Sequence, residues 1–133
     1  MVEQIRSKKG DIIAIIIRGK ERPRGVRFFT PPDFSQQVGL LRHKKGSVVK
    51  PHVHKLIRRK VEITQEVLYV KEGKIALYLY DGSKKHIATR FLKGGDTVIL
   101  ASAGHGIKVL EESLILEIKQ GPYAGADDKE YIE

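Results

Sequence analysis

The sequence contains no cysteine, and this absence removes several kinds of chemistry at once. No disulfide, no thiolate zinc site and no catalytic thiol can form. Any metal ion must therefore be held by histidine, aspartate or glutamate side chains, or by water.

Long apolar runs are also missing. The run at residues 12–17 is six residues long, whereas a helix needs roughly 20 to cross a membrane. Acidic and basic residues precede this run, and no small-residue cleavage site follows it, so we do not read it as a signal peptide. We expect a cytoplasmic protein with no membrane partner.

Positive charge is in excess, with 25 Lys and Arg against 16 Asp and Glu, a net charge of +9. The basic residues are scattered in pairs such as Lys8-Lys9 and Lys84-Lys85. There is no RNA-binding aromatic signature and no zinc-finger spacing, which argues against nucleic acid. A small anionic ligand, or simply a solvated basic surface, fits this charge better.

Helical periodicity is absent, and short β-rich runs alternate with turn residues. Strands are expected at 12–18, 26–30, 37–43, 47–54, 62–70, 74–80, 86–91, 97–100, 106–110 and 113–119. Asp81-Gly82 is a strong hairpin signal. The 133 residues suit a single domain, and this pattern predicts an all-β sandwich or barrel.

Two histidines and a glutamate form the first half of a candidate metal site. His52 and His54 lie two residues apart, so a strand would point both to the same face. Glu66 shares its face with Leu68 and Val70. A carboxylate on such an apolar face needs a partner, because an unpaired buried charge is costly. A metal ion would be such a partner.

His105 is the fourth candidate ligand, on a face shared with Ile107 and Val109. Three imidazoles and one carboxylate suit one divalent transition metal ion such as Zn, Mn, Fe, Ni or Co. Glu62 is an alternative carboxylate ligand, since it has the same strand parity as Glu66. The alternative to a metal site is a set of ordinary surface histidines and a paired carboxylate.

Three basic residues are candidate contacts for an anionic ligand. Lys50 shares the parity of His52, and Arg58 and Arg59 follow closely in the chain. If their loop borders a barrel mouth, they would attract phosphate or carboxylate. The alternatives are a rim position for Lys50 and a solvated loop for the two arginines.

These residues resemble the two motifs of the cupin superfamily. Gly46-SVVKP-His52-Val-His54 is similar to the opening of the first motif, and Glu66-VLYVKE-Gly73 to its end. The 11 residues between His54 and Glu66 exceed the family's three or four. GGDTVILASAGHGIKV resembles the second motif, with His105 at the histidine position, but Leu100, Ser102 and Val109 replace its Pro, inner Gly and Asn.

The resemblance implies a cupin double-stranded β-helix, a jelly-roll barrel, over the single domain 1–133. Its core would span about 37–119, with N-terminal strands at 11–30 and a tail at 120–133. It implies a metal site of His52, His54, Glu66 and His105. The end of the chain is similar to small cupins of polysaccharide and sugar-nucleotide synthesis, which implies a small anionic, carbohydrate-related ligand.

Several activities remain open within that family. The chain could be a metal-dependent isomerase, a sugar-nucleotide isomerase or epimerase without metal, an Fe(II) dioxygenase, or a metal-free ligand-binding or structural cupin. We also expect a homodimer, because the runs 62–70 and 12–17 carry apolar residues on both faces.

Overall fold

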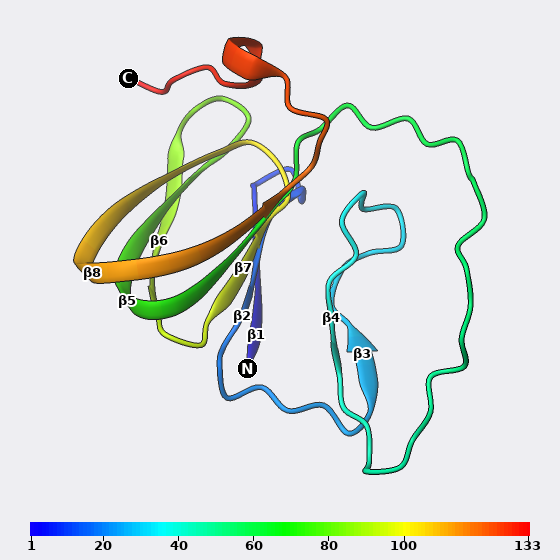
Figure 1. Cartoon of the computed structure of the whole chain (residues 1–133). Helices are drawn as coiled ribbons and strands as arrows, with labels where there is room; N and C mark the ends of the chain where they lie inside the picture. Colours follow the sequence, from blue (N-terminus) through cyan, green and yellow to red (C-terminus); the bar gives the residue numbers. More distant parts are fainter.

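The computed structural model describes all residues, 1–133, and the chain is almost entirely β-structure (Figure 1). The strands are β1 (Val2–Arg6), β2 (Ile12–Ile17), β3 (Val26–Phe28), β4 (Gly39–Leu41), β5 (Glu66–Tyr80), β6 (His86–Lys93), β7 (Thr97–Leu100) and β8 (Gly104–Lys119). One 3₁₀ turn, η1 (Gly125–Asp128), follows them. The all-β prediction is confirmed. No helix here has the length and apolar character needed to span a membrane.

A curled antiparallel sheet forms the body of the molecule. Its order is β1-β2-β7-β5-β6, and β8 pairs with the other side of β5. The first part of β5 pairs with β7 and the second part with β6, while β8 follows β5 along its whole length. β5 and β8 therefore curve together and form a half-barrel (Figure 1). β3 and β4 pair only with each other.

The bend of this half-barrel lies where the sequence predicted a turn. Lys71-Glu72-Gly73 does not end a strand; instead β5 continues through it with register shifts against β8. Such bulges bend a strand and increase its twist. Gly73 has a φ of 94°, which only glycine adopts without strain. The predicted strands 62–70 and 74–80 are thus one bent strand, and 106–110 and 113–119 likewise merge into β8.

The apolar strand β2 is covered on both faces by its own chain. Ile13 and Ile16 belong to a cluster inside the half-barrel with Leu77 and Leu92. Ile15 and Ile17 belong to a second cluster, which includes Phe29 and against which Val38 and Leu40 pack. The two apolar faces of this strand, from which we predicted a dimer, are therefore accounted for within one chain.

Residues 42–65 differ most from the prediction. The strand expected at 47–54 is absent, and no residue of this segment has regular secondary structure. The segment leaves the body after β4, runs outward as a long loop and returns at the start of β5 (Figure 1). A strand needs a neighbour to receive its backbone hydrogen bonds, and the segment has none beside it. The strand β1, in contrast, was not predicted, because its five residues are mostly polar.

Candidate functional site

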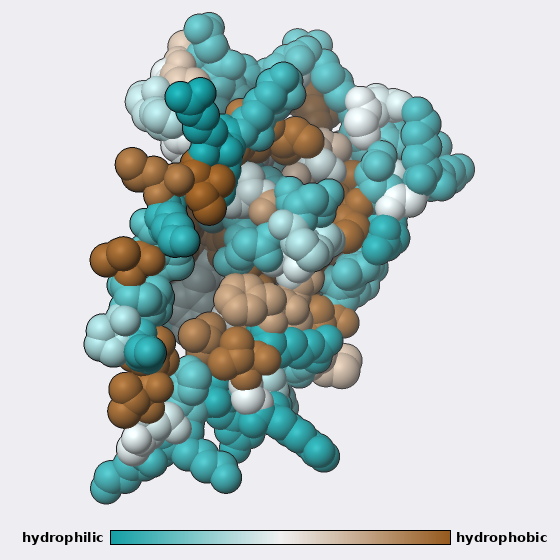
Figure 2. Space-filling view, turned by 90° about the vertical axis from the view of Figure 1, so that its right-hand side faces the viewer, coloured by the Kyte–Doolittle hydropathy of each residue, from teal (hydrophilic) through white to brown (hydrophobic).

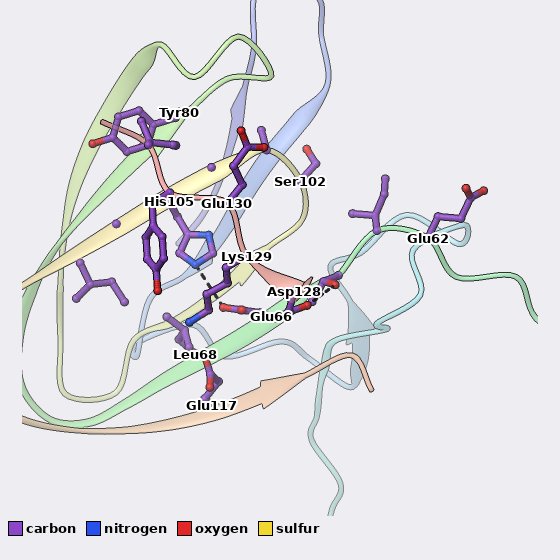
Figure 3. Close-up of a pocket in the computed structure, with 18 residues that line it drawn as sticks. Glu62, Glu66, Leu68, Tyr80, Ser102, His105, Glu117, Asp128, Lys129 and Glu130 are labelled. Atoms are coloured by element: carbon purple, nitrogen blue, oxygen red, sulfur yellow. Dashed lines mark hydrogen bonds and ion pairs between the residues drawn. The ribbon is translucent and has the colours of Figure 1, made fainter. Parts of the chain in front are cut away.

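Glu66 and His105 are brought together by the curvature of β5 and β8. Glu66 is the first residue of β5, opposite Lys119, and His105 is near the start of β8, opposite Leu79 near the far end of β5. The bend returns the two ends of this strand pair to each other at the open mouth of the half-barrel. The imidazole Nε2 of His105 then lies 3.4 Å from Oε2 of Glu66 (Figure 3).

The carboxylate of this pair is buried and its charge is balanced by its neighbours. Glu66 is only 8% exposed. The imidazole of His105 holds the pKa of Glu66 below its usual 4.5, and the charges of Lys119 and Lys129 act in the same direction. These effects exceed the opposing effect of burial, which raises the pKa of a carboxyl group. Glu66 is therefore ionised at neutral pH and can accept a proton or a cation.

The pair opens into a cavity of about 770 Å³ at the mouth of the half-barrel. Leu68, Tyr80, Ile107 and Glu117 are among the residues that line it. This volume lies in the range of about 300–1,000 Å³ that small-molecule sites occupy. Fewer than half of its lining residues are hydrophobic, so the cavity could orient a small polar molecule.

The C-terminal tail forms the remaining wall of the cavity. Its residues 128–132 all line it. Two ion pairs fix the tail to the body, Lys84–Glu130 at 2.5 Å and Lys119–Asp128 at 3.5 Å. The tail approaches β8 so closely at Gly104 that a Cβ there would lie 2.5 Å from Cδ1 of Ile132. The tail is thus a structural part of the site.

The two other predicted ligands, His52 and His54, lie elsewhere. Both are exposed on the segment 42–65, with ring centroids 5.2 Å apart. Nδ1 of His52 is 2.7 Å from the carbonyl oxygen of Lys50. No three histidine, aspartate or glutamate side chains of the chain converge as a ready metal site. The structure therefore brings together two of the four predicted ligands, Glu66 and His105.

Glu62, the rival carboxylate, is at the edge of the cavity and apart from His105 (Figure 3). It is highly exposed and 3.5 Å from Lys60. Of the two glutamates, only Glu66 contacts the histidine. The predicted ligand-binding residues Lys50, Arg58 and Arg59 are exposed on the same outer segment and do not line the cavity.

Sequence reasoning missed the residues that the tail contributes. Lys129 lines the cavity beside Glu66, and Asp128 does so from η1 (Figure 3). No motif marks them, because their role depends on the tail folding back over the start of β8. Tyr80 was also missed, since it lies outside both motifs. The hairpin signal Asp81-Gly82 just after it places it at the end of β5.

The separation of the Glu66 and His105 donor atoms fits metal ligation. Two atoms each about 2.1 Å from a tetrahedral ion lie about 3.4 Å apart, as Oε2 and Nε2 do here. One carboxylate oxygen and one imidazole nitrogen suit a divalent transition metal ion. Two ligands do not make a strong site, so further donors must come from another part of the chain, from a second copy or from water.

The same pair has a second chemical capacity. A histidine beside a carboxylate that orients it is a common arrangement for moving a proton to or from a bound molecule. His105 is a third exposed at its side chain, and it also lines the cavity.

Comparison of the chain with protein-family models, with curated proteins and with solved structures found no match.

Proposed function

We propose that this chain is a cupin-like metal-binding protein that takes up a small anionic molecule in the cavity beside the metal ion. Glu66 and His105 supply two ligands, and His52 and His54 supply the others. The observation that carries the proposal is the 3.4 Å contact between Glu66 and His105 at the mouth of an open half-barrel. The ion would act there as a Lewis acid or as a template that orients the ligand.

The cupin part of this proposal requires one strand that the sheet lacks. A half-barrel becomes a closed jelly roll only if a further strand covers its open edge. The predicted strand 47–54 carries both remaining histidines and has no place in the sheet. Its docking on the body would complete the barrel and the ligand set in one step.

The charges around the cavity are mixed, since five carboxylates (Glu62, Glu66, Glu117, Asp128 and Glu130) line it together with one lysine. The anionic-ligand part of the proposal therefore depends on the positive groups that follow. Lys129 lines the cavity, and Lys119 is close enough to Glu66 to lower its pKa. A bound metal ion would add further positive charge. Lys50, Arg58 and Arg59 lie on the segment that we propose to dock, and they would then border the mouth. Their charges would attract a phosphate or carboxylate group.

The contact between Glu66 and His105 also favours a second candidate function, which needs no metal ion. His105 facing Glu66 could move a proton on a sugar-like ligand, as an isomerase or epimerase of the metal-free class requires. In this case the pair alone is sufficient, and His52 and His54 have no part in the site.

Equilibrium dialysis against Zn²⁺, Mn²⁺ and Ni²⁺ separates the two candidates. The metal-binding proposal expects about one ion per chain for the wild type, and loss of that ion in Glu66→Gln. Glu62→Gln is the matched control, because it removes a carboxylate of the same cavity and should keep the ion. A wild type that retains no ion after dialysis would leave the metal-free candidate.

A further inference from the structure

Two parts of the surface hold most of the exposed large apolar residues of the chain. On the segment 42–65 they are Val48, Val49, Val53, Leu56, Ile57, Val61 and Ile63. On β8 they are Ile107, Val109, Leu110, Leu114, Leu116 and Ile118. Apolar side chains gathered in this way usually mark a contact surface.

The segment has the composition of a strand but lacks a partner. From residue 48 to residue 64 its backbone forms no hydrogen bond with other backbone groups. Val49, Val53, Ile57 and Val61 all have the same parity, so an extended chain would present them on one face. Apolar and hydrophilic side chains are mixed on the side of the molecule that carries this segment (Figure 2).

The strand β8 has a free edge whose backbone groups could form hydrogen bonds with the segment. Its 16 residues are hydrogen-bonded to β5 along one edge, and its other edge pairs with no strand. A long, apolar and unpaired edge is normally shielded, because it can pair with any available strand. The part of β8 nearest the mouth of the half-barrel is Gly104–Leu110, seven residues long. The predicted strand 47–54 is eight residues long, so the two lengths match closely.

The charges of the two surfaces are complementary at the bend of β8. Residues 42–60 contain eight lysines and arginines and no acidic residue. β8 contains three glutamates, Glu111, Glu112 and Glu117, and two lysines, Lys108 and Lys119. Glu111 and Glu112 are adjacent and exposed at its bend. Pairing would set positive side chains beside negative ones and would disperse the like charge of the free segment.

The positions of the two surfaces favour a second copy as the partner. The segment leaves on the side of β3 and β4, whereas the bend of β8 lies on the opposite side of the molecule (Figure 1). Each chain carries both surfaces, so a two-fold axis would satisfy both at once and would close the assembly. Exchange of such an element between identical chains is a low-cost route to a dimer.

We propose that two copies of this chain exchange the segment 47–63, which pairs with the free edge of β8 in the other copy. The metal part of this inference rests on the function proposed above. In the exchanged dimer, His52 and His54 of one chain reach Glu66 and His105 of the other. Each site is then built from two chains, and neither chain holds a complete site alone.

Complementation between two defective variants tests the exchange. One variant carries His52→Ala and His54→Ala, and the other carries Glu66→Gln and His105→Ala. Neither should bind Co²⁺ alone. After they are unfolded together and refolded, half of the dimers are mixed and one site in each mixed dimer is intact. About a quarter of the wild-type Co²⁺ capacity should therefore return.

Cross-linking separates failure of the exchange from failure of the metal site. Because the chain has no cysteine, Val53→Cys and Val109→Cys can be placed in separate preparations, mixed and treated with a short bismaleimide. The exchange predicts a covalent pair of one chain of each kind, and Lys9→Cys with Val109→Cys should give none.

Three results would be decisive. Cross-linking without Co²⁺ binding by the wild type keeps the exchange and rejects the metal site. Co²⁺ binding by the wild type, with none recovered in the mixture, overturns the exchange and assigns the segment to its own chain. A monomer in light scattering at micromolar concentration overturns the exchange outright.

Discussion

Glu66 combines burial with a negative charge, and this makes its contribution to stability dependent on pH. Its pKa in the folded state is lowered below 4.5, chiefly by His105. A group with a lowered folded-state pKa stabilises the fold above its unfolded pKa, and this stabilisation is lost as the pH falls through the folded value. The relevant window is therefore at and below about pH 4.5.

Glu66→Gln should lower the free energy of unfolding at pH 7 by about 1 kcal/mol, because it removes a charged hydrogen-bond acceptor. The difference from the wild type should shrink as the pH falls below 4.5, where the wild-type carboxyl group also becomes neutral. Urea denaturation between pH 3 and pH 7, with a chelator present, measures this. A difference that stays constant over the whole range would show that the Glu66 charge does not stabilise the fold.

Lys129 should contribute to ligand binding, although no motif marks it. Lys129→Gln is expected to weaken the binding of a nucleoside diphosphate about five- to tenfold, because it removes one positive charge from the cavity. Higher salt should reduce the wild-type affinity towards that of the variant. Lys9→Gln, in an exposed turn that does not line the cavity, has the same effect on net charge and should leave calorimetric affinity unchanged.

At the scale of single elements, the bend in β5 decides whether Glu66 can meet His105. Gly73 lies in this bend with a positive φ, and a Cβ there would overlap the carbonyl oxygen of Glu112 and the side chain of Ser113. Both neighbours belong to β8, so they cannot move without shifting the paired strand. The geometry of the site therefore depends on this one glycine.

Gly73→Ala should destabilise the fold by about 2–3 kcal/mol, since backbone strain and overpacking both act there. Gly10→Ala is the matched control, because Gly10 has the same φ of 94° and no atom within 4 Å of an added Cβ. Gly10→Ala should lower the free energy of unfolding by about 1 kcal/mol, from backbone strain alone. If thermal unfolding showed the same loss of stability in both variants, the contact of β8 with this bend would make no contribution to the effect.

The elements also show how much could be predicted from sequence. The strand 97–100 was predicted with its correct ends, and β2 and β6 nearly so, because their apolar patterns end at clear turn residues. Glu66 and His105 were predicted as two of four metal ligands, and in the structure these two lie 3.4 Å apart. The merging of 62–70 with 74–80 could not be predicted, because a Lys-Glu-Gly turn signal and a glycine-centred bend look alike in sequence. The outward course of 42–65 depends on which strand accepts its backbone hydrogen bonds. The sequence of the segment does not indicate which strand that is.

At the scale of the whole molecule, the exposed apolar surface predicts association. Each Val, Leu or Ile side chain that becomes fully buried contributes about 1.5–3 kcal/mol, and the segment and β8 together expose many of them. A stable dimer needs only part of this gain, since association itself has a substantial entropic cost.

The unfolding temperature should accordingly rise with protein concentration, because a dimer is stabilised by mass action and a monomer is not. Scanning calorimetry over a hundredfold concentration range measures the dependence. Val53→Asp should reduce it, since it puts a charge on the apolar face of the segment. A midpoint that is independent of concentration would indicate that folding and association are not coupled.

The central claim is that Glu66 and His105 hold a metal ion that His52 and His54 complete, and titration with Co²⁺ followed by visible absorption tests it most directly. Nitrogen and oxygen ligation gives visible bands that saturate, and we expect saturation at one ion per chain at pH 7.5. The affinity should fall as the pH is lowered, because protons compete with the ion for the imidazole nitrogens. His105→Ala and His52→Ala should each abolish the saturable signal. Unchanged spectra in both variants, or no saturable signal from the wild type, would contradict the account.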